Sequence, residues 1–389
     1  MSKIIVTGLD IGTSSIRLVV CEPIKDSKIP RVLAQVKTES RGLRRGYLVN
    51  FDEALANLRQ AITEAERQIK TRIKSVILGI GGITLESKVS EGQVVISRAD
   101  LEVTENDIQR AVESSEHNLG DFANRRVIHQ IPLGFKLDGK KVLGRPEGLK
   151  GQKLEVKTLF IQCLQQHVGD LMRLATSAGL VVEDIVAAPL AASFPTLTTT
   201  QKTAGCVLAN IGSQTTSIVT FEDNLPVSLQ VFPLGSNDVT NDIALGLRVP
   251  IEEAEKMKIE DYQAQTLNLR KKLDEIIEAR LSDMFELIDN HLKKIGRNGL
   301  LPAGIIVVGG GAKVEHLERL ARDTLKIPAK IFDPHNLAYL KNQIKDAAWV
   351  VAYGLCLFGL GLESEESFGV KLMRTTKQNF LKWLRELLP

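Results

Sequence analysis

A short glycine-containing pattern occurs twice in this chain, and it limits the possible folds more than any other feature. Residues 9–16 read LDIGTSSI, and residues 209–216 read ANIGSQTT. Each copy lies between two runs of β-forming residues, which predicts a β-hairpin with a glycine in its turn. Two hairpins of one pattern, far apart in the sequence, predict two related lobes.

Hydrophobic spacing elsewhere predicts helices that alternate with strands. Apolar residues recur at helical spacing over residues 55–69, and residues 75–80 then have the composition of a buried strand. The longest helical pattern covers residues 269–295 and stops before a glycine. A strand at 304–308 precedes three glycines and a helix that we expect from about Lys313. This order of elements indicates an α/β fold.

Composition excludes several function classes. A chain of 389 residues favours more than one core, and its net charge of +3 provides no global field for nucleic acid. The four cysteines stand singly in apolar runs, which predicts buried thiols and a reducing compartment. The N-terminal segment carries Asp10 and Arg17 and lacks a cleavage site, and no apolar run reaches the ~18 residues of a spanning helix. We therefore expect a protein that is made and kept in the cytoplasm.

The histidines and serines form no catalytic or metal-binding pattern. None of the six histidines pairs with a cysteine or carboxylate at ligand spacing, so we predict no histidine-based metal site. A Ser-His-Asp triad likewise lacks a nucleophile elbow.

The two turns are candidate phosphate sites. A turn of this kind can direct backbone N–H groups and hydroxyls into a concavity, and Asp10 is placed to hold Mg²⁺ through water. A plain hairpin connection is the alternative for either turn alone. Two equivalent turns favour the phosphate site, because one nucleotide can be gripped from both lobes. The candidate contacts are Asp10, Gly12, Thr13 and Ser14 in the first turn and Asn210, Gly212, Ser213 and Thr215 in the second.

A third glycine-rich segment, Gly309, Gly310 and Gly311, follows the strand at 304–308. Glycines at a strand-to-helix junction permit close approach of a ligand, and a helix N-terminus favours anions. A tight turn is the alternative. Residues 79–82 (GIGG) lack a dinucleotide-binding pattern, and we interpret them as structural.

The C-terminal segment changes character abruptly. Residues 361–369 include a short acidic stretch that we interpret as a linker, and residues 370–389 are basic and apolar. Wound as a helix, this end has an apolar band with basic residues at its borders, the composition of an interfacial membrane helix. A helix docked on the protein's own core is the alternative. The predicted membrane-binding residues are Lys377, Phe380, Leu381, Lys382, Trp383, Leu384, Arg385, Leu387 and Leu388.

Motifs along essentially the whole chain resemble those of the FtsA family. The similar segments are residues 40–43 (SRGL), 129–132 (HQIP), 137–139 (LDG), 148–155 (GLKGQKLE), 240–244 (TNDIA), 253–258 (EAEKMK), 276–280 (IIEAR) and 303–311 (AGIIVVGGG).

The resemblance implies an actin-like α/β fold, with ribonuclease H-like duplicated lobes and an FtsA-type inserted subdomain. The expected division is lobe one at residues 1–84, 161–192 and 336–360, the inserted subdomain at 85–160, the core of lobe two at 193–234 and 302–335, its outer subdomain at 235–301, the linker at 361–369 and the amphipathic helix at 370–389.

The resemblance also implies a function. ATP is expected between the lobes, held by Gly12, Thr13, Gly212, Gly310 and Gly311, with Glu255 and Lys258 near the nucleoside. From the residues alone, the charged stretch at 252–256 is equally typical of a solvated helix face.

The expected partners are the C-terminal tail of FtsZ at the outer subdomain, further copies of the chain in a head-to-tail polymer, an anionic membrane surface, and other division proteins. The protein is then a peripheral adaptor on the cytoplasmic face of the cell membrane at the division site.

Three departures from the family pattern concern the nucleotide. Asn210 stands where the family has an aspartate, and Ser15 stands where a basic residue is common. Residues 187–191 (AAPLA) contain no Gln or Glu to orient an attacking water. We therefore expect at most a weak ATPase.

Three alternatives to the adaptor also agree with the sequence. One is a pilus-assembly scaffold of the PilM type, which shares the expected fold but has its membrane connection through a partner peptide. A second is an FtsA paralogue that binds no nucleotide. The third is a small-molecule kinase of the same superfamily, for which no acceptor-binding residues are visible.

Overall fold

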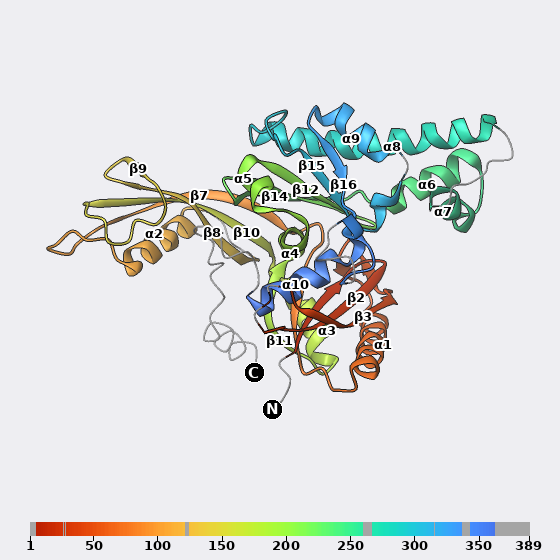
Figure 1. Cartoon of the computed structure of the whole chain (residues 1–389), viewed down its shortest axis with the longest axis horizontal. Helices are drawn as coiled ribbons and strands as arrows, with labels where there is room; N and C mark the ends of the chain where they lie inside the picture. Colours follow the sequence, from red (N-terminus) through yellow and green to blue (C-terminus); the bar gives the residue numbers. More distant parts are fainter. Residues whose placement is uncertain are drawn as a thin grey trace.

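The computed structural model describes residues 5–25, 27, 29–120, 124–259, 267–314, 316–336 and 343–361. Two lobes lie one above the other, and an arm extends sideways from the junction between them (Figure 1). The linker and amphipathic helix predicted at residues 361–369 and 370–389 lie, apart from Gly361, outside the described residues. Among the described helices, none combines the length and the apolar character needed to cross a membrane.

The first lobe contains a five-stranded sheet in the order β11-β6-β1-β2-β3. Strands β1, β2 and β3 are antiparallel neighbours, whereas β6 and β11 run parallel to β1. The strands are β1 (Val6–Ile11), β2 (Ser15–Glu22), β3 (Arg31–Glu39), β6 (Ser75–Ile80) and β11 (Val181–Ala187). A small hairpin of β4 (Leu43–Arg44) and β5 (Tyr47–Leu48) follows β3.

The second lobe repeats this topology. Its sheet has the order β14-β13-β12-β15-β16, with an antiparallel half and a parallel half in the same relative places. The prediction of two related lobes is therefore confirmed. The strands are β12 (Cys206–Ile211), β13 (Thr216–Glu222), β14 (Leu225–Phe232), β15 (Ile305–Val308) and β16 (Ala329–Ile331).

Helices cover both sheets. Those of the first lobe are α1 (Phe51–Ile69), α3 (Gln165–Ser177), α4 (Ala188–Thr196) and α10 (Val350–Leu360). Those of the second are α5 (Thr199–Ala204), α6 (Ser236–Leu247), α7 (Ile251–Ile259), α8 (Leu267–Lys294) and α9 (Leu317–Leu325). The described residues also form the short 3₁₀ turns η1 (Gly310–Lys313), η2 (Pro334–Asn336) and η3 (Ala347–Trp349).

Local sequence signals fix several of these ends. The side chain of Asn50 caps α1 by accepting a hydrogen bond from the N–H of Glu53. The predicted helix at 269–295 is confirmed by α8, which ends at Lys294. The helix expected from Lys313 begins later than predicted, because residues 310–313 form the turn η1 and α9 starts only at Leu317.

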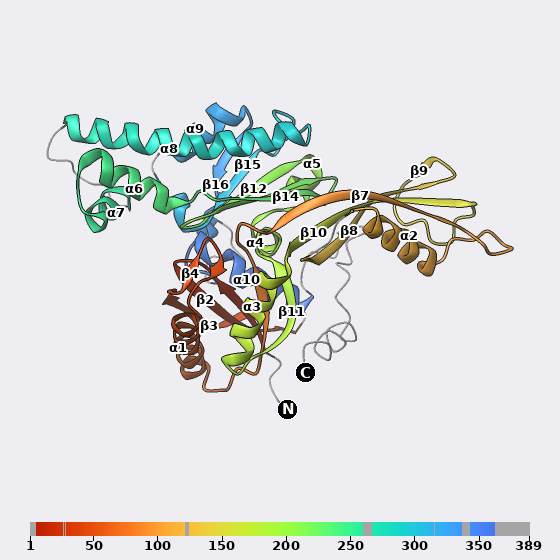
Figure 2. The same cartoon turned by 180° about the vertical axis from the view of Figure 1, so that it is seen from behind.

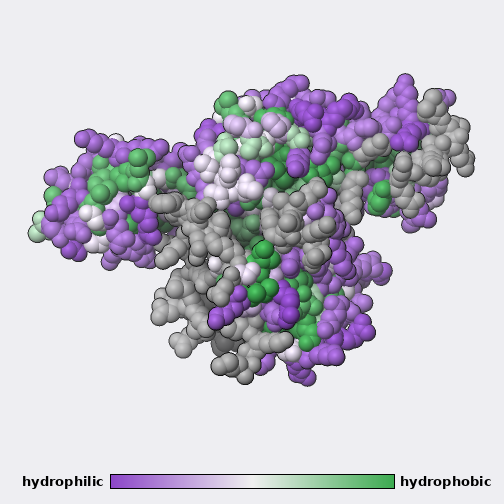
Figure 3. Space-filling model, in the orientation of Figure 1, coloured by the Kyte–Doolittle hydropathy of each residue, from purple (hydrophilic) through white to green (hydrophobic). Residues whose placement is uncertain are grey.

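The arm is the inserted subdomain, a four-stranded sheet with one helix on it. Its strands are β7 (Glu86–Val95), β8 (Arg125–Leu137), β9 (Lys140–Val142) and β10 (Lys153–Leu164), in the order β7-β10-β8-β9, and helix α2 (Glu105–His117) packs on β7 and β10. A reciprocal capping box between Thr104 and Asp107 starts α2. Figures 2 and 3 show the arm reaching away from both lobes, with hydrophobic patches on its surface among polar ones.

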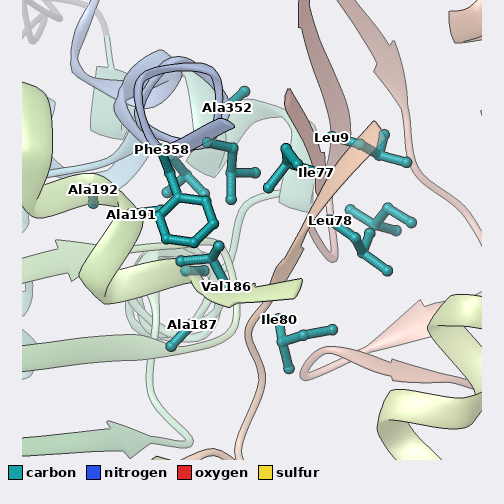
Figure 4. Packing of buried hydrophobic residues seen from close by; sticks show 14 of the residues in the cluster. Leu9, Ile77, Leu78, Ile80, Val186, Ala187, Ala191, Ala192, Ala352 and Phe358 are labelled. Carbon is teal, nitrogen blue, oxygen red and sulfur yellow. The ribbon is translucent and has the colours of Figure 1, made fainter. Parts of the chain in front are cut away.

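The core of the first lobe depends on close approach of α10. Phe358 and Ala352 of α10 lie beside Ile77 of β6 and Ala191 of α4 (Figure 4). The four cysteines are free and buried, as predicted: Cys21, Cys163, Cys206 and Cys356.

Gly354 is the residue that allows α10 and α4 to meet. A Cβ atom at this position would lie 1.9 Å from the carbonyl oxygen of Ala191. We expect Gly354→Ala to lower the free energy of unfolding by about 3 kcal/mol, since a rigid backbone atom must move. Gly169→Ala is the matched control, because Gly169 lies in α3 with open space around its Cβ position, and it should gain about 0.5–1 kcal/mol. Denaturant unfolding measures both, and equal stability of the two variants would contradict the packing argument.

Candidate functional site

The two glycine turns have the same internal geometry. In the first, the N–H of Gly12 donates to the carbonyl oxygen of Ser15 at 3.1 Å, and in the second the N–H of Gly212 donates to that of Thr215 at 2.8 Å. A Cβ atom on either glycine would lie 2.9–3.0 Å from the same carbonyl oxygen. Both turns therefore need a glycine at this position for one steric reason.

The turns face each other across a narrow cavity of about 110 Å³ between the lobes. Ten of the thirteen residues predicted to contact the cofactor line it: Asp10, Gly12, Thr13, Ser14, Asn210, Gly212, Ser213, Thr215, Gly309 and Gly310. Residues 350 and 351, at the start of α10, close one side. The folding of two distant segments onto one cavity is what the repeat predicted.

A larger cavity of about 850 Å³ adjoins the narrow one. Both are lined by Gly309 and Ala347, and the larger one extends between α7, α8 and the segment that follows β16. Its volume is within the range of about 300–1,000 Å³ that small-molecule sites occupy. The predicted contact Lys258 lines this cavity, whereas Glu255 and Gly311 line neither of the two.

Lys258 is held in place by a buried network. Its ammonium group donates to Thr240 Oγ1 at 2.7 Å, to Glu255 Oε2 at 2.6 Å and to the carbonyl oxygen of Ser236 at 3.2 Å. The Lys258 side chain is only 4% exposed, and that of Glu255 is 43% exposed. Glu255 is thus connected to the cavity through Lys258. The solvated-face alternative for the stretch at 252–256 holds for Glu252 and Glu253, which are exposed.

Gly309 lies where the two cavities meet, and no side chain fits at its position. Its φ is +96°, and a Cβ would lie 2.3 Å from Asn210 Oδ1 and 2.5 Å from the carbonyl oxygen of Ile211. Gly311 packs against Ile211 and Ser236 and supports the wall from behind. Gly310, by contrast, has open space at its Cβ position.

The turn between β4 and β5 connects the two lobes at the cavity rim. The N–H of Gly46 donates to Thr13 Oγ1 at 3.0 Å, and the N–H of Arg45 donates to Gln214 Oε1 at 2.9 Å. One short turn therefore contacts both glycine turns at once. Nothing in the local sequence of this hairpin indicated the contact, because its two partners lie 33 and 169 residues away.

Arg17 is the charged residue that sequence reasoning missed. It lies directly across the β1–β2 ladder from Asp10, and both line the narrow cavity. Burial raises the pKa of Asp10 to about 6, and the positive charge of Arg17 opposes part of that rise. The equivalent pair in the second lobe, Asn210 and Ser217, is neutral.

Two glycines interpreted as structural also belong to the cavity wall. Gly81 and Gly82 follow β6 and line the narrow cavity beside Gly46. A Cβ on Gly46 would lie 2.5 Å from the Cα of Gly82. Two glycines directly after a strand are a signal for a ligand site. The lack of a dinucleotide-binding pattern led to the structural interpretation instead.

The expectation that no histidine pairs with a cysteine is wrong for one pair. His167 Nδ1 lies 3.5 Å from Cys163 Sγ and 2.8 Å from Thr84 Oγ1. Burial raises the pKa of Cys163 to about 11, so the thiol stays protonated. Within the described ranges, no group of three or more His, Cys, Asp or Glu side chains is arranged to hold a metal.

The shape and chemistry of the cavities fit a nucleotide better than they fit a divalent cation. Gly12, Gly212, Gly309 and Gly310 line the narrow cavity and let a ligand approach the backbone closely, and the larger cavity has room for a nucleoside. For Mg²⁺, the donor set is poor: Asp10 is the single carboxylate among the described residues that line the narrow cavity, and a guanidinium stands opposite it.

Two family models match the chain. The model described as "Cell division protein FtsA" matches residues 207–354, and the model described as "SHS2 domain inserted in FTSA" matches residues 82–162. The second range coincides with the arm.

Full-length relatives agree with the models. The cell division protein FtsA of Pseudomonas aeruginosa is 30% identical over 380 residues, covering 92% of this chain and 90% of the relative. The FtsA of Bacillus subtilis is 28% identical and that of Escherichia coli K12 25% identical, covering 90% and 98% of this chain and 82% and 96% of the relatives.

Solved structures share the fold. A PilM-PilN type IV pilus biogenesis complex superposes with a TM-score of 0.67 at 21% identity, covering 92% of this chain and 99% of that one. MreB5 of Spiroplasma citri bound to ADP superposes with a TM-score of 0.52 at 13% identity, covering 92% and 97%. With an actin-like fold, the inserted arm and relatives matched along nearly its whole length, the chain belongs to the FtsA family of cell division proteins.

Proposed function

We propose that this protein is an ATP-binding, polymerising adaptor that links FtsZ filaments to the cytoplasmic membrane and brings further division proteins to the division site. The observation that carries the proposal is the narrow cavity between the lobes, which both glycine turns line and which adjoins a larger cavity, in a chain of the FtsA family. The phosphates would lie against the turns around Gly12 and Gly212, and the nucleoside beside Lys258.

Nucleotide in this site would act by joining the lobes. The Arg45–Gly46 turn already contacts the turns of both lobes, and a ligand held by the same two turns adds its binding energy to that closed arrangement. A ligand shifts a conformational equilibrium by its differential affinity for the two states. Binding alone can therefore favour a polymer-competent form, with no need for turnover.

Hydrolysis is not part of the proposal. The segment at 187–191 places Ala188 on the wall of the narrow cavity, and alanine cannot orient a water. The N–H of Ala187 donates to His129 Nε2 at 3.0 Å, and burial lowers the pKa of His129 to about 3, so this imidazole is a neutral acceptor that is already used. These features also disfavour the kinase alternative.

The two remaining contacts of the adaptor are proposed from different parts of the chain. For the FtsZ tail we propose the outer subdomain at 235–301, which exposes Leu245 and Ile251. For the membrane we propose residues 370–389 on sequence grounds. The arm, whose exposed residues include Val95 and Leu143, is the proposed surface for contact between copies in a polymer.

Filling the cavity without disturbing the fold tests the nucleotide. Gly310→Val places a side chain in open space at the cavity wall, and we expect a loss of ATP affinity of roughly tenfold or more. Gly134→Val is the control, because Gly134 also has open space at Cβ but lies on β8 in the arm. Titration of a fluorescent ATP analogue and thermal unfolding are measured for both variants. A wild type that binds no nucleotide would support the nucleotide-independent paralogue instead.

A further inference from the structure

Among the described residues that line the narrow cavity, one side chain is positive and one is negative, and the two lie side by side on neighbouring strands. Among the described residues that line it, Asp10 and Arg17 are the charged ones. They are direct cross-strand neighbours, a relation in which opposite charges attract. To a divalent cation the pair offers one carboxylate whose charge is offset by an adjacent guanidinium.

The other positions around the cavity add little for a cation. Asn210 provides an amide where Asp10 has its carboxylate in the first lobe, and its Oδ1 lies against Gly309. Ala188 has no oxygen in its side chain. Mg²⁺ needs near-octahedral oxygen ligation and is bound in proteins through carboxylates together with phosphate oxygens. The residues present do not fit it well.

Arg17, in contrast, has an unused donor. Its Nε atom is buried and has no hydrogen-bond partner within the described part of the chain. A buried N–H without an acceptor is costly, so a ligand oxygen at this place would remove a penalty as well as add a charge-assisted bond.

Arg17 can also replace the basic residue that is common in the family at the position of Ser15. Residues two apart on a strand share a face, so Ser15 and Arg17 of β2 face the same side of the sheet. The Ser15 hydroxyl is itself buried and has no hydrogen-bond partner among the residues that the structure describes, and Arg17 is the residue of the two that carries a positive charge. A guanidinium also matches phosphate oxygens in a bidentate geometry.

We propose that the Arg17 guanidinium binds the phosphate oxygens of a nucleotide in this cleft in place of a divalent cation, so that nucleotide binding does not require Mg²⁺. This rests on the proposed nucleotide binding. Arg17 would then supply the positive charge that Mg²⁺ supplies in sites where carboxylates and phosphates bind the ion. Without the metal, the chain would bind a nucleotide but would lack a group that promotes phosphoryl transfer.

The test is a titration of the full chain with a fluorescent ATP analogue, once in excess Mg²⁺ and once in EDTA. The wild type should bind with the same affinity, within roughly threefold, in both. Arg17→Gln should weaken binding roughly 10- to 100-fold in both buffers, and Arg17→Lys should retain part of it. Lys37→Gln is the matched control, because Lys37 is the cross-strand neighbour of Arg17 on β3, is exposed, and does not line the cavity.

Asn210→Asp supplies the reverse test. A second carboxylate should create a cation site, so ATP binding by this variant should weaken in EDTA and recover with Mg²⁺.

Each outcome has one meaning. If the wild type binds only with Mg²⁺, the inference fails while nucleotide binding stands. If neither buffer gives binding, both fail. If Arg17→Gln binds as the wild type does in EDTA while Lys37→Gln is also unchanged, Arg17 is not the neutralising group. Thermal unfolding of each variant shows whether a loss of ATP affinity comes from misfolding. If Arg17→Gln misfolds, Arg17→Lys tests the inference, because it keeps the positive charge and should retain part of the binding.

Discussion

Removal of residues 370–389 is expected to abolish co-sedimentation of the protein with anionic vesicles, a loss of at least roughly tenfold in bound fraction. The segment has five basic residues against one acid, and its apolar side chains include Phe380 and Trp383. Trp suits the headgroup layer, and lysine and arginine attract anionic lipid.

The same deletion distinguishes this hypothesis from a tail docked on the protein's own core. A docked tail would leave vesicle binding at its previous level and lower the melting temperature, because a buried apolar face would be lost. An interfacial tail should do the opposite. Trp383→Glu is a milder variant with the same expected direction, and Lys371→Gln is its control, since it removes one charge and leaves the apolar band intact.

A single short amphipathic helix binds membranes weakly, which has a consequence for the polymer. Linking many such helices converts each further attachment into an intramolecular event with a high effective concentration. Vesicle binding should therefore rise steeply with protein concentration, in step with filament formation.

The lobes could be predicted from sequence because their signal is local. At Gly12 and Gly212, a Cβ atom would collide with the carbonyl oxygen of the residue three positions later. Both turns therefore require a glycine at the same place, and this requirement is visible in the sequence as a repeated short pattern. The strand after the first turn is likewise predicted from its local sequence, and the alternation of faces along it places Arg17 on the same face as Ser15, which is the signal for the Arg17 contact.

What could not be predicted depends on contacts between distant segments. Gly46 and Gly82 face the cavity only because two separate connections lie against each other. The late start of α9 has a similar cause: Gly309 adopts a positive φ against Asn210, and His316 adopts another at 64°, so the helix begins after both. No periodicity in residues 309–317 contains that information.

The second large effect is expected at the corner between α6 and α7, the proposed contact of the FtsZ tail. Leu245 near the end of α6 is 79% exposed, and Ile251 at the start of α7 is 55% exposed. Arg248 makes a left-handed turn between the helices. The corner is fixed from behind, because the guanidinium of Arg280 on α8 holds both carboxylate oxygens of Asp242 at 2.6 and 3.1 Å. A rigid corner with exposed apolar side chains is suited to bind an apolar peptide.

Leu245→Asp and Ile251→Asp are each expected to weaken binding of a peptide that carries the FtsZ C-terminal tail by roughly tenfold or more. Burial of one such side chain contributes about 1.5–3 kcal/mol, and 1.4 kcal/mol corresponds to tenfold in affinity. Fluorescence anisotropy of the labelled peptide measures this, and ATP binding and melting temperature should not change because both side chains are exposed.

Leu300→Asp is the matched control for the corner. Leu300 is 64% exposed in the same outer subdomain but lies beyond the far end of α8, so its charge should leave peptide affinity unchanged. If Leu300→Asp weakens binding and the two corner variants do not, the tail docks at the opposite end of α8. If all three bind the peptide as the wild type does, neither the α6–α7 corner nor the region of Leu300 is the FtsZ contact, because a buried interface cannot accept a carboxylate at its centre without loss of affinity.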